Sequence, residues 1–339
     1  MRAVVFRGPG RPLEGDHWST PAPGRRQLLI RVKACGICGS DLHAAESERT
    51  PKNIVMGHEM GGIIAALGEG VDRWHVGQRV APLSQISCGQ CAACRSNRSS
   101  DCAKLEIIAF NPRYNGGYAE YVIVGEGDVL PLPDSVGFDE AAVLEPLAVG
   151  LDAVRPAKLQ VSEAVLILGA SPIGLAIATW ARFFGAAHIV VSEPHAHRRA
   201  LALQVGATAV IDPAAETELL TAVLARTGSP VAVLFEAVGL PGMVRTCIEL
   251  AAPRSRVVFA GLCQMPETLD VYNCTFKALE LIFPFGYSVA DYAFILMAIG
   301  QGGVSAKPLI SHRISLDEVP AMFESLRHPT DHCKVIVEP

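Results

Sequence analysis

The sequence lacks an excess of basic residues, runs of like charge and long uninterrupted apolar segments. Its 339 residues contain 29 Lys and Arg against 34 Asp and Glu, which gives a formal net charge of −5 at pH 7. Nucleic-acid binding normally depends on a basic face that neutralises phosphates, so this balance argues against a nucleic-acid partner. No segment reaches the roughly 18 consecutive apolar residues of a membrane-spanning helix, so we expect no membrane partner.

An export signal is also missing from the first residues. Residues 1–10 do not show the positively charged start and following apolar stretch of a secretory signal peptide. We therefore expect a cytoplasmic protein. Half of the residues are hydrophobic and only 19% are charged, which indicates an extensive buried core rather than a disordered chain. A chain of this length fits two domains better than one.

The pattern of apolar residues changes once along the chain. Up to about residue 140 it carries short runs typical of β-strands, such as 28–32, 62–67 and 118–124, separated by Gly, Pro and Asp. From about residue 161, strand-like and helix-like segments alternate, which predicts a doubly wound parallel sheet covered on both faces. The alternating segments are 164–168, 172–184, 188–191, 195–205, 209–211, 216–227, 231–236, 242–250 and 256–260.

The rest of the chain differs from both regions. After Gly261 the alternation fades, and the tail offers helices near residues 292–299 and 316–326 and a last strand at 334–337. A tail this short cannot bury a core of its own, so we expect it to return to the first domain.

Four closely spaced cysteines form the first candidate metal site. Their C-x2-C-x2-C-x7-C spacing lets four thiolates surround one tetrahedral zinc ion and leaves no position for water, which is typical of structural zinc. Two disulfides, an iron-sulfur cluster and a nucleic-acid-binding zinc ribbon are the alternatives. The cysteines of this segment are Cys88, Cys91, Cys94 and Cys102. Four isolated cysteines, expected to be buried thiols, are Cys247, Cys263, Cys274 and Cys333.

Three separated pieces of sequence supply a second candidate metal site. A thiolate, an imidazole and a carboxylate leave one position of a zinc ion open, which is the coordination expected of a catalytic zinc. The pieces are CGICGSDLH at 35–43, GHE at 57–59 and LEPLAVG at 144–150, with Cys38, His58, Glu59 and Glu145 as candidate ligands.

Each of these residues also has a different interpretation. His58 could be a satisfied polar residue, and Glu145 could cap a helix. Cys35 and Cys38 could form a redox C-x-x-C pair. The residues alone leave these alternatives open.

A glycine-containing turn opens the alternating region. The apolar run VLILG leads into GASPIG and then into an amphipathic segment, and backbone amides at such a helix start can hold a pyrophosphate. The strict G-x-G-x-x-G pattern is broken, because Ser171 occupies the position of the second glycine. The candidate cofactor residues of this turn are Gly169, Ser171, Pro172, Ile173 and Gly174.

An acidic residue follows the next strand. Glu193 lies 24 residues after Gly169, where a carboxylate can hydrogen-bond the adenosine ribose hydroxyls and repel a 2′-phosphate. This position favours NAD over NADP. Arg198, among the basic residues that follow, could instead meet a phosphate, although a solvated helix face also explains it.

Taken together, these motifs resemble one enzyme family. ICGSDLH, GHE, the four-cysteine segment, GGYAEYV, EPLAVG and the nucleotide-binding segment occur in the order of the zinc-containing medium-chain dehydrogenases. The chain resembles their sorbitol, 2,3-butanediol and threonine dehydrogenase branch over nearly its whole length. The resemblance implies a GroES-like catalytic domain at 1–147, completed by 287–339, and a Rossmann NAD-binding domain at 148–286.

The resemblance also implies roles for single residues. Cys38, rather than Cys35, matches the thiolate ligand of the catalytic zinc. His58 matches the imidazole ligand, and Glu145 matches the third protein ligand, as in polyol-type enzymes. Glu59 matches an acid that either binds zinc or lies just behind it, and the sequence leaves open which carboxylate binds.

A proton path and a nicotinamide site follow from the same resemblance. Bound zinc would lower the pKa of the alcohol hydroxyl, and the nicotinamide ring would accept the hydride. The proton then leaves through Ser40, the cofactor ribose and His43, although Ser40 as a helix cap and His43 as a surface residue are alternatives. In the family, the segments that contain Gly239 and Gly261 approach the nicotinamide.

The sequence therefore predicts a zinc-dependent oxidoreductase that transfers hydride between a secondary alcohol or polyol and NAD. We expect one catalytic and one structural zinc per chain, with residues 84–86 and Tyr114 lining the alcohol pocket. The branch implies a homotetramer, with a homodimer as the alternative. An NADP-preferring member of the family, a zinc-free reductase of the same fold and a non-catalytic zinc-stapled nucleotide-binding protein are the competing predictions.

Overall fold

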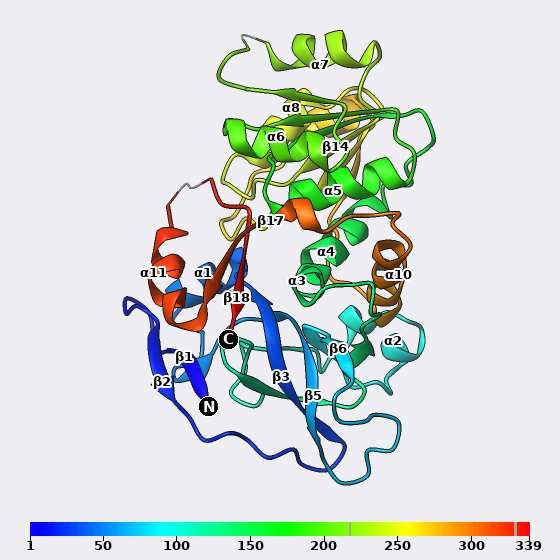
Figure 1. The fold of residues 1–339 in the computed structure, drawn as a ribbon. Coiled ribbons are helices and arrows are strands. Elements are labelled where there is room, and N and C mark those ends of the chain that lie inside the picture. Colours follow the sequence, from blue (N-terminus) through cyan, green and yellow to red (C-terminus); the bar gives the residue numbers. More distant parts are fainter. Residues whose placement is uncertain (217, 329–330) are drawn as a thin grey trace. The chain divides into compact units, whose positions relative to one another are not determined.

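The computed structural model describes residues 1–216, 218–328 and 331–339, drawn as a ribbon in Figure 1. Residue 217 of the expected helix 216–227 and residues 329–330 of the expected tail lie outside the described residues. In the described ranges, none of the helices has the length and apolarity needed to span a membrane. The chain forms two compact units, which are Met1–Glu145 with Tyr287–Gly302 and Ile310–Pro339, and Pro146–Gly286 with Gly303–Leu309.

The first unit is built mainly from β-strands. Its strands are β1 (Arg2–Phe6), β2 (Glu14–His17), β3 (Gln27–Gly36), β4 (Ile54–Val55), β5 (Glu59–Leu67), β6 (Arg79–Pro82), β7 (Gln85–Ile86), β8 (Glu106–Ile107), β9 (Tyr121–Gly125), β10 (Val129–Pro131), β17 (Ile310–Ser315) and β18 (Lys334–Glu338). The largest sheet has seven strands in the order β10-β6-β5-β3-β18-β17, with β9 also paired to β3. A three-stranded sheet, β2-β1-β4, and the pair β7-β8 complete the set.

Short helices connect these strands. They are α1 (Gly39–Glu46), α2 (Ala92–Arg95), α3 (Phe138–Ala141), α4 (Leu144–Val154), α10 (Val289–Gly300) and α11 (Val319–Ser325), with 3-10 turns η1 (Ser99–Asp101), η2 (Lys307–Leu309) and η3 (Leu316–Glu318). Helix α4 starts in the first unit and continues into the second, and η2 belongs to the second unit.

Strand β3 determines where the candidate ligands lie. Most of its residues are buried, with Arg31 exposed and Lys33 partly exposed, and it ends at Gly36, two residues before Cys38. Strand β5 begins at Glu59 and runs antiparallel to β3, so that Glu59 lies opposite Gly36. On the other edge of β3, strand β18 pairs antiparallel, with Ile336 opposite Gly36 (red in Figure 1). This pairing brings Lys334, at the start of β18, to the end of β3.

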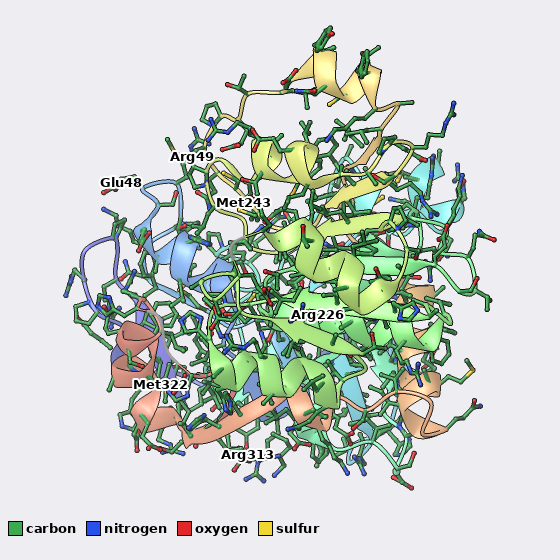
Figure 2. The ribbon with its side chains drawn as sticks, turned by 90° about the horizontal axis from the view of Figure 1, so that it is seen from above. Glu48, Arg49, Arg226, Met243, Arg313 and Met322 are labelled. Carbon is green, nitrogen blue, oxygen red and sulfur yellow. The ribbon has the colours of Figure 1, made fainter. Side chains whose placement is uncertain are left out.

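The second unit contains a parallel sheet between helices. Its elements are β11 (Ala164–Leu168), α5 (Pro172–Phe183), β12 (His188–Ser192), α6 (Ala196–Gln204), β13 (Ala209–Ile211), α7 (Leu219–Thr227), β14 (Val233–Glu236), α8 (Met243–Leu250), β15 (Arg256–Phe259), α9 (Val271–Phe276) and β16 (Glu280–Ile282). Arg226 in α7 and Met243 in α8 are labelled in the side-chain view of Figure 2. The six strands are parallel in the order β13-β12-β11-β14-β15-β16. All five residues of β11 are buried, as expected of a strand covered on both faces, which confirms the predicted doubly wound fold.

The strand order reverses between β11 and β14. Strands β12 and β13 lie on one side of β11, and strands β14 to β16 lie on the other. Open α/β sheets bind ligands outside the carboxyl ends of their strands at such a switch point. Gly169 follows β11 directly, and Glu236 is the last residue of β14, so both lie at this edge.

The sheet extends further than the sequence pattern indicates. The predicted alternation stops at Gly261, but helix α9 and strand β16 follow it, and β16 pairs with β15. Strand β16 has only three residues and helix α9 buries none of its residues. Neither element therefore shows the periodic apolar face by which strands and helices are recognised in a sequence.

Candidate active site

The four candidate ligands of the catalytic zinc converge, although they come from three separate parts of the chain. Cys38 directly precedes α1, Glu59 begins β5 with His58 just before it, and Glu145 lies in the first turn of α4. Each of the four residues offers one ligand atom, and these four atoms all lie within 4.8 Å of one another. Tetrahedral zinc with bonds of about 2.0–2.3 Å holds its ligand atoms roughly 3.3–3.8 Å apart, so small side-chain movements would let one ion join them.

Two glycines allow this convergence. Gly57, which precedes His58, has a φ of +91°, and a Cβ there would lie only 2.8 Å from Cys35 Sγ. A Cβ at Gly36 would overlap Glu59 Oε2. Side chains at either position would therefore push His58 or Glu59 away from the cluster.

The two cysteines of the C-x-x-C run have different environments. Cys35 is fully buried against Gly57 and Gly117, and burial together with the charge of Asp41 raises the pKa of its thiol well above the usual range. A thiol of this kind is inert, because the thiolate is the reactive form. The redox-pair interpretation is thus disfavoured. Among the isolated cysteines only Cys247 is buried, whereas Cys263, Cys274 and Cys333 are partly exposed.

A buried aspartate that the sequence analysis missed lies behind the histidine. Asp41 Oδ1 lies 3.3 Å from His58 Nδ1, although the two do not align as a hydrogen bond. Asp41 Oδ2 accepts hydrogen bonds from the Cys38 backbone N–H (3.1 Å) and the Tyr118 hydroxyl (2.7 Å). A carboxylate beside Nδ1 orients an imidazole and leaves Nε2 available for a metal.

Burial shifts the pKa values of two candidate ligands away from the metal-binding form. Burial, and then the charge of Glu59, raise the pKa of the Cys38 thiol. Burial also raises the pKa of Glu145 to about 7, with His58 opposing and Glu59 adding to the shift. Burial disfavours the charged form of His58, but Asp41 and Cys38 outweigh it and raise the pKa of His58. A divalent cation would displace these protons, so the donor set fits zinc.

A lysine from the last strand neutralises Glu59, and the sequence analysis missed it as well. Lys334 Nζ donates to both carboxylate oxygens of Glu59, each at 2.7 Å, and to the Ile37 carbonyl at 3.2 Å. The side chains of Lys334 and Glu59 are 2% and 0% exposed. No local sequence signal connects the two residues, because they are 275 positions apart.

Glu145 is held by weaker hydrogen bonds than Glu59. The hydroxyl of Tyr287 donates to Glu145 Oε1 over a long distance of 3.5 Å, and Glu145 is only partly buried. Of the two carboxylates, Glu145 therefore has the greater freedom to move toward a metal.

Buried hydroxyls lie beside the cluster. Ser84 donates to the His58 carbonyl at 2.7 Å, so the Tyr292 hydroxyl, 3.1 Å from Ser84 Oγ, is the donor in their contact. The rings of Tyr292 and Tyr287 pack with centroids 5.1 Å apart. Of the residues expected to line an alcohol pocket, Ser84 is at the cluster, whereas Ile86 and Tyr114 pack in the apolar core.

The two residues expected to relay the proton lie on α1. Ser40 Oγ donates to Cys38 Sγ at 3.2 Å, and His43 is exposed in the last turn of the helix. Cys38, not Ser40, occupies the N-cap position, so the helix-cap interpretation of Ser40 is wrong. Residues three positions apart share one face of a helix, which places Ser40 and His43 on the same side.

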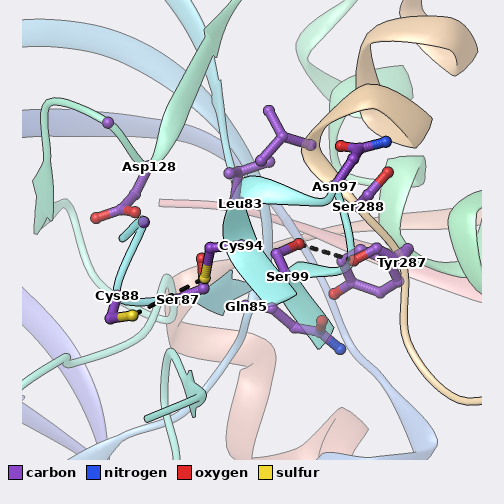
Figure 3. A pocket seen from close by; sticks show the side chains of 13 residues that line it. Leu83, Gln85, Ser87, Cys88, Cys94, Asn97, Ser99, Asp128, Tyr287 and Ser288 are labelled. Atoms are coloured by element: carbon purple, nitrogen blue, oxygen red, sulfur yellow. Dashed lines mark hydrogen bonds between the residues drawn. The ribbon is translucent and has the colours of Figure 1, made fainter. Parts of the chain in front are cut away.

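The four-cysteine segment forms a separate sulfur cluster. The sulfur atoms of Cys88, Cys91, Cys94 and Cys102 all lie within 4.8 Å of one another, with 3.4 Å between Cys91 and Cys94 and 3.9 Å between Cys88 and Cys94. Sulfur atoms around tetrahedral zinc lie about 3.8 Å apart. Backbone N–H groups of Gln90 and Cys91 lower the pKa of Cys88 to about 6. The pKa of Cys94 is also lowered, mainly by Ser87, whereas that of Cys91 is raised. A cavity of about 300 Å³ lies beside the segment (Figure 3).

The nucleotide-binding turn lies at the carboxyl end of β11. Gly169 has a φ of +93°, and a Cβ at Gly174 would overlap the Gly169 carbonyl. Ser171, in place of the second glycine, is the N-cap of α5, where its Oγ accepts from the Gly174 N–H (3.3 Å) and donates to the Ala237 carbonyl (2.9 Å). The first helical residues of α5 are Pro172 and Ile173.

Glu193 lies next to this turn, just after β12. Its carboxylate accepts from the Ala170 N–H at 2.8 Å and from the His195 N–H at 2.9 Å. Burial opposes its charge, but these two donors and the nearby Arg198 hold the pKa of Glu193 below its usual value. Arg199 donates to the Glu193 and Pro194 carbonyls, so its guanidinium is already engaged by backbone oxygens.

The two glycines implied at the nicotinamide end are packed together. Gly239 has a φ of +73°, and a Cβ on it would lie 3.0 Å from the Leu262 nitrogen. A Cβ at Gly261 would overlap the Gly239 nitrogen. Both positions therefore require glycine.

Both units match domains of known dehydrogenases. Residues 24–134 match the alcohol dehydrogenase GroES-like domain, and residues 172–299 match the zinc-binding dehydrogenase domain. L-threonine 3-dehydrogenase of Rhizobium johnstonii is 31% identical over 96% of this chain and 95% of its own length. Sorbitol dehydrogenase of Bacillus subtilis is 30% identical over 100% of this chain and 97% of its own length.

A solved structure extends the likeness to three dimensions. A provisionally assigned zinc-binding dehydrogenase from Sinorhizobium meliloti 1021, bound to NADP, has a TM-score of 0.90 and 30% sequence identity, with 100% of this chain and 99% of that chain covered. The GroES-like and Rossmann fold class predicted from the sequence is confirmed. The chain belongs to the zinc-dependent medium-chain dehydrogenase family of alcohol dehydrogenases.

Proposed function

We propose that this protein is a zinc-containing, NAD(P)-dependent dehydrogenase that oxidises a secondary alcohol or polyol at the cluster of Cys38, His58 and Glu145. The observation that carries the proposal is the convergence of a sulfur, an imidazole nitrogen and carboxylate oxygens within 4.8 Å. Relatives named threonine and sorbitol dehydrogenases support a hydroxyl-bearing substrate.

Each residue near the cluster has a proposed task. Bound zinc lowers the pKa of an alcohol hydroxyl, and the nicotinamide accepts the hydride. Cys38, His58 and Glu145 would hold the ion, because Glu59 is occupied by Lys334. Asp41 keeps the imidazole oriented through Nδ1.

The proton leaving the alcohol is proposed to pass over helix α1. Ser40 Oγ, 3.2 Å from the Cys38 sulfur, is near enough to the cluster to take the proton first. His43 is exposed, and an imidazole exchanges protons with water near neutral pH. Ser40 and His43 therefore form the inner and outer ends of the proposed path.

The neighbouring hydroxyls favour a substrate with more than one hydroxyl. Ser84, Tyr287 and Tyr292 provide hydrogen-bonding groups next to Glu145 in otherwise buried surroundings. Each hydroxyl already has one partner in the protein, but its oxygen can accept a further hydrogen bond, which a second substrate hydroxyl can donate and an alkyl chain cannot. We expect vicinal polyols or β-hydroxy amino acids to be better substrates than simple alcohols.

A matched pair of cysteine variants tests the proposal. Cys38→Ala should lose one zinc ion per chain and nearly all NAD-linked oxidation of a polyol panel, because it removes a ligand. Cys35→Ala changes a thiol three positions away that packs outside the cluster, and it should keep both zinc ions and most of the activity. Metal analysis and NADH absorbance give the two readouts. Retention of activity by Cys38→Ala would refute the assignment and favour a zinc-free reductase.

We also propose NAD as the preferred cofactor. Glu193 places a negative charge beside the turn at Gly169, where it would repel a 2′-phosphate. The NADP in the Sinorhizobium meliloti structure makes NADP preference the alternative. Glu193→Ala should lower the ratio of NAD to NADP efficiency, and an unchanged ratio would count against this role.

Two zinc ions per chain are proposed, with the second at Cys88, Cys91, Cys94 and Cys102. The sulfur separations and the lowered pKa of Cys88 support a thiolate-bound structural ion. A protein with this zinc but no turnover would be the non-catalytic alternative, which the polyol panel distinguishes. A cytoplasmic location is proposed as well, since thiolate zinc clusters suit a reducing compartment.

Self-association is proposed through the edge of the second unit's sheet. Strand β16 ends the sheet, and six large apolar residues in the segments that precede and follow it are 62–80% exposed. They are Leu262, Met265, Tyr272, Phe276, Phe283 and Phe285. Such exposure marks an interface, and two copies related by a two-fold axis can pair identical edges.

Variants of this apolar edge test self-association. Phe276→Asp with Phe285→Asp should dissociate the assembly in light scattering behind size exclusion. A two-fold contact here gives a dimer, and the tetramer implied by the family branch would need a second contact elsewhere. A monomeric parent protein would refute the proposal.

A further inference from the structure

Glu236 is a buried acid with no part in the reaction described above. It ends strand β14 and is 3% exposed. Among the ion pairs of the described residues, none involves Glu236. Its Oε1 instead accepts hydrogen bonds from the backbone N–H groups of Val238 (2.7 Å) and Gly239 (2.8 Å). A buried carboxylate bound this way fixes the loop that follows it, because its charge strengthens both bonds.

The same residue also holds a second loop. The Glu236 backbone carbonyl accepts from the N–H groups of Ala260 (2.8 Å) and Gly261 (2.9 Å). A Cβ at Gly261 would overlap both Glu236 Oε2 and the Gly239 nitrogen. The side chain and the main chain of Glu236 thus join the loops 237–239 and 260–262, which touch each other through two glycines.

Both loops lie at the sheet edge where the cofactor is expected. Strand β14 neighbours β11, and the strand order reverses between them. We propose that Glu236 is a positioning residue that holds the two glycine loops in the conformation that receives the nicotinamide half of NAD. This inference rests on the proposed function, in which these loops approach the nicotinamide.

The adenosine half depends on other bonds. The Gly169 N–H donates to the Ser192 carbonyl at 2.8 Å, and the Ala170 N–H donates to Glu193 at 2.8 Å. None of these bonds involves the Glu236 carboxylate, and neither does the bond from Ser171 Oγ to the Ala237 carbonyl. Loss of the Glu236 carboxylate should therefore affect the nicotinamide half selectively.

Two ligands that share the adenosine half test this selectivity. NADH contains both halves of the cofactor, whereas 5′-AMP contains only the adenosine half. We expect Glu236→Ala to weaken NADH binding by about tenfold or more in calorimetric titration, as loss of a charge-assisted bond implies, with AMP affinity unchanged. Glu236→Gln keeps an acceptor oxygen and should recover most of the NADH affinity. The KM for NAD should follow the same order.

Glu267 offers a matched control. It lines the same cavity of about 310 Å³ as Glu236, and its Oε1 accepts from the Gly242 N–H at 2.7 Å, at the start of α8. Glu267→Ala removes a carboxylate that holds backbone without holding the glycine loops, so it should leave the ratio of NADH to AMP affinity unchanged.

Every outcome distinguishes positioning from a general structural role. Equal loss of NADH and AMP binding, or no loss of either, overturns the inference. If Glu236→Ala does not fold, Gly261→Ala keeps the carboxylate but forces the loops apart, and it should weaken NADH without weakening AMP. Neither titration needs zinc or an alcohol. A protein that binds NADH as described but oxidises no alcohol would sink the proposed function and leave this inference intact.

Discussion

Replacing Lys334 by methionine would measure how strongly the candidate site depends on the ion pair at Glu59. Lys334 Nζ lies 2.7 Å from each oxygen of Glu59, and both side chains are buried. At an effective dielectric constant of about 20, unit charges at this separation attract by about 6 kcal/mol. Methionine keeps most of the lysine side chain's volume, so the main loss is the compensating charge.

We expect the free energy of unfolding to fall by about 3–5 kcal/mol in Lys334→Met, the usual cost of leaving one partner of a buried pair alone. Urea unfolding of the zinc-loaded protein, followed by circular dichroism, gives the measurement. The freed Glu59 carboxylate lies within the ligand cluster, so it should compete for the open metal position and lower turnover with zinc content unchanged.

A double-mutant cycle provides the control. Lys334→Met combined with Glu59→Gln removes both charges, and it should recover more than half of the stability lost in the single variant. A loss below about 1 kcal/mol in Lys334→Met would refute the reasoning, since a buried pair costs more than that to break. A double variant no more stable than Lys334→Met would refute it as well.

Other residues give further predictions. Asp41→Asn should weaken zinc binding at the His58 cluster by about 10–100-fold in chelator competition, and loss of both zinc ions together would contradict a local role. Burial raises the pKa of Asp128 from 3.8 to about 6, so the folded state favours the protonated carboxyl. The contribution of this group to the free energy of unfolding is complete below about pH 4 and is lost as the pH rises through 6. Asp128→Asn cannot ionise, so in thermal melts it should be more stable than the parent protein by up to about 3 kcal/mol at pH 8 and equally stable at pH 4. An equal gain in stability at both pH values would exclude titration of Asp128 as the cause. Cys94→Ser should lose one zinc ion and lower the melting temperature while zinc at the Cys38 cluster remains, and loss of neither ion would count against a structural zinc.

The two clusters of candidate ligands could be anticipated because their sequence signals are local. The four cysteines at 88–102 have a spacing that few other structures require, and ICGSDLH, GHE and EPLAVG each occur as short runs. The strands of the second unit are buried on both faces and read as continuous apolar segments, so most of that fold was predictable. The structure brings these segments together, while the roles of the single residues stay predictions.

The features that escaped prediction depend on tertiary contacts. In the sequence nothing distinguishes Asp41 from other residues of α1, and only the fold places it next to His58. The role of Lys334 depends on its ion pair with Glu59, which lies 275 positions away in the sequence. In the sequence Glu236 is an ordinary acid at the end of a strand, and its four hydrogen bonds to backbone N–H groups form only when loops 237–239 and 260–262 meet. Strand β16 is too short to show a period.

The distance between Glu59 and Lys334 along the chain also bears on the order of folding. Most of the second unit, 146–286, is one continuous segment whose strands can pair before the rest of the chain is synthesised, and only 303–309 join it later. The first unit must wait for β18 to pair with β3, and such non-local pairing is slow. Until residue 334 has been synthesised, Glu59 cannot form its ion pair with Lys334, so binding of the proposed catalytic zinc should be among the last events in the maturation of this enzyme.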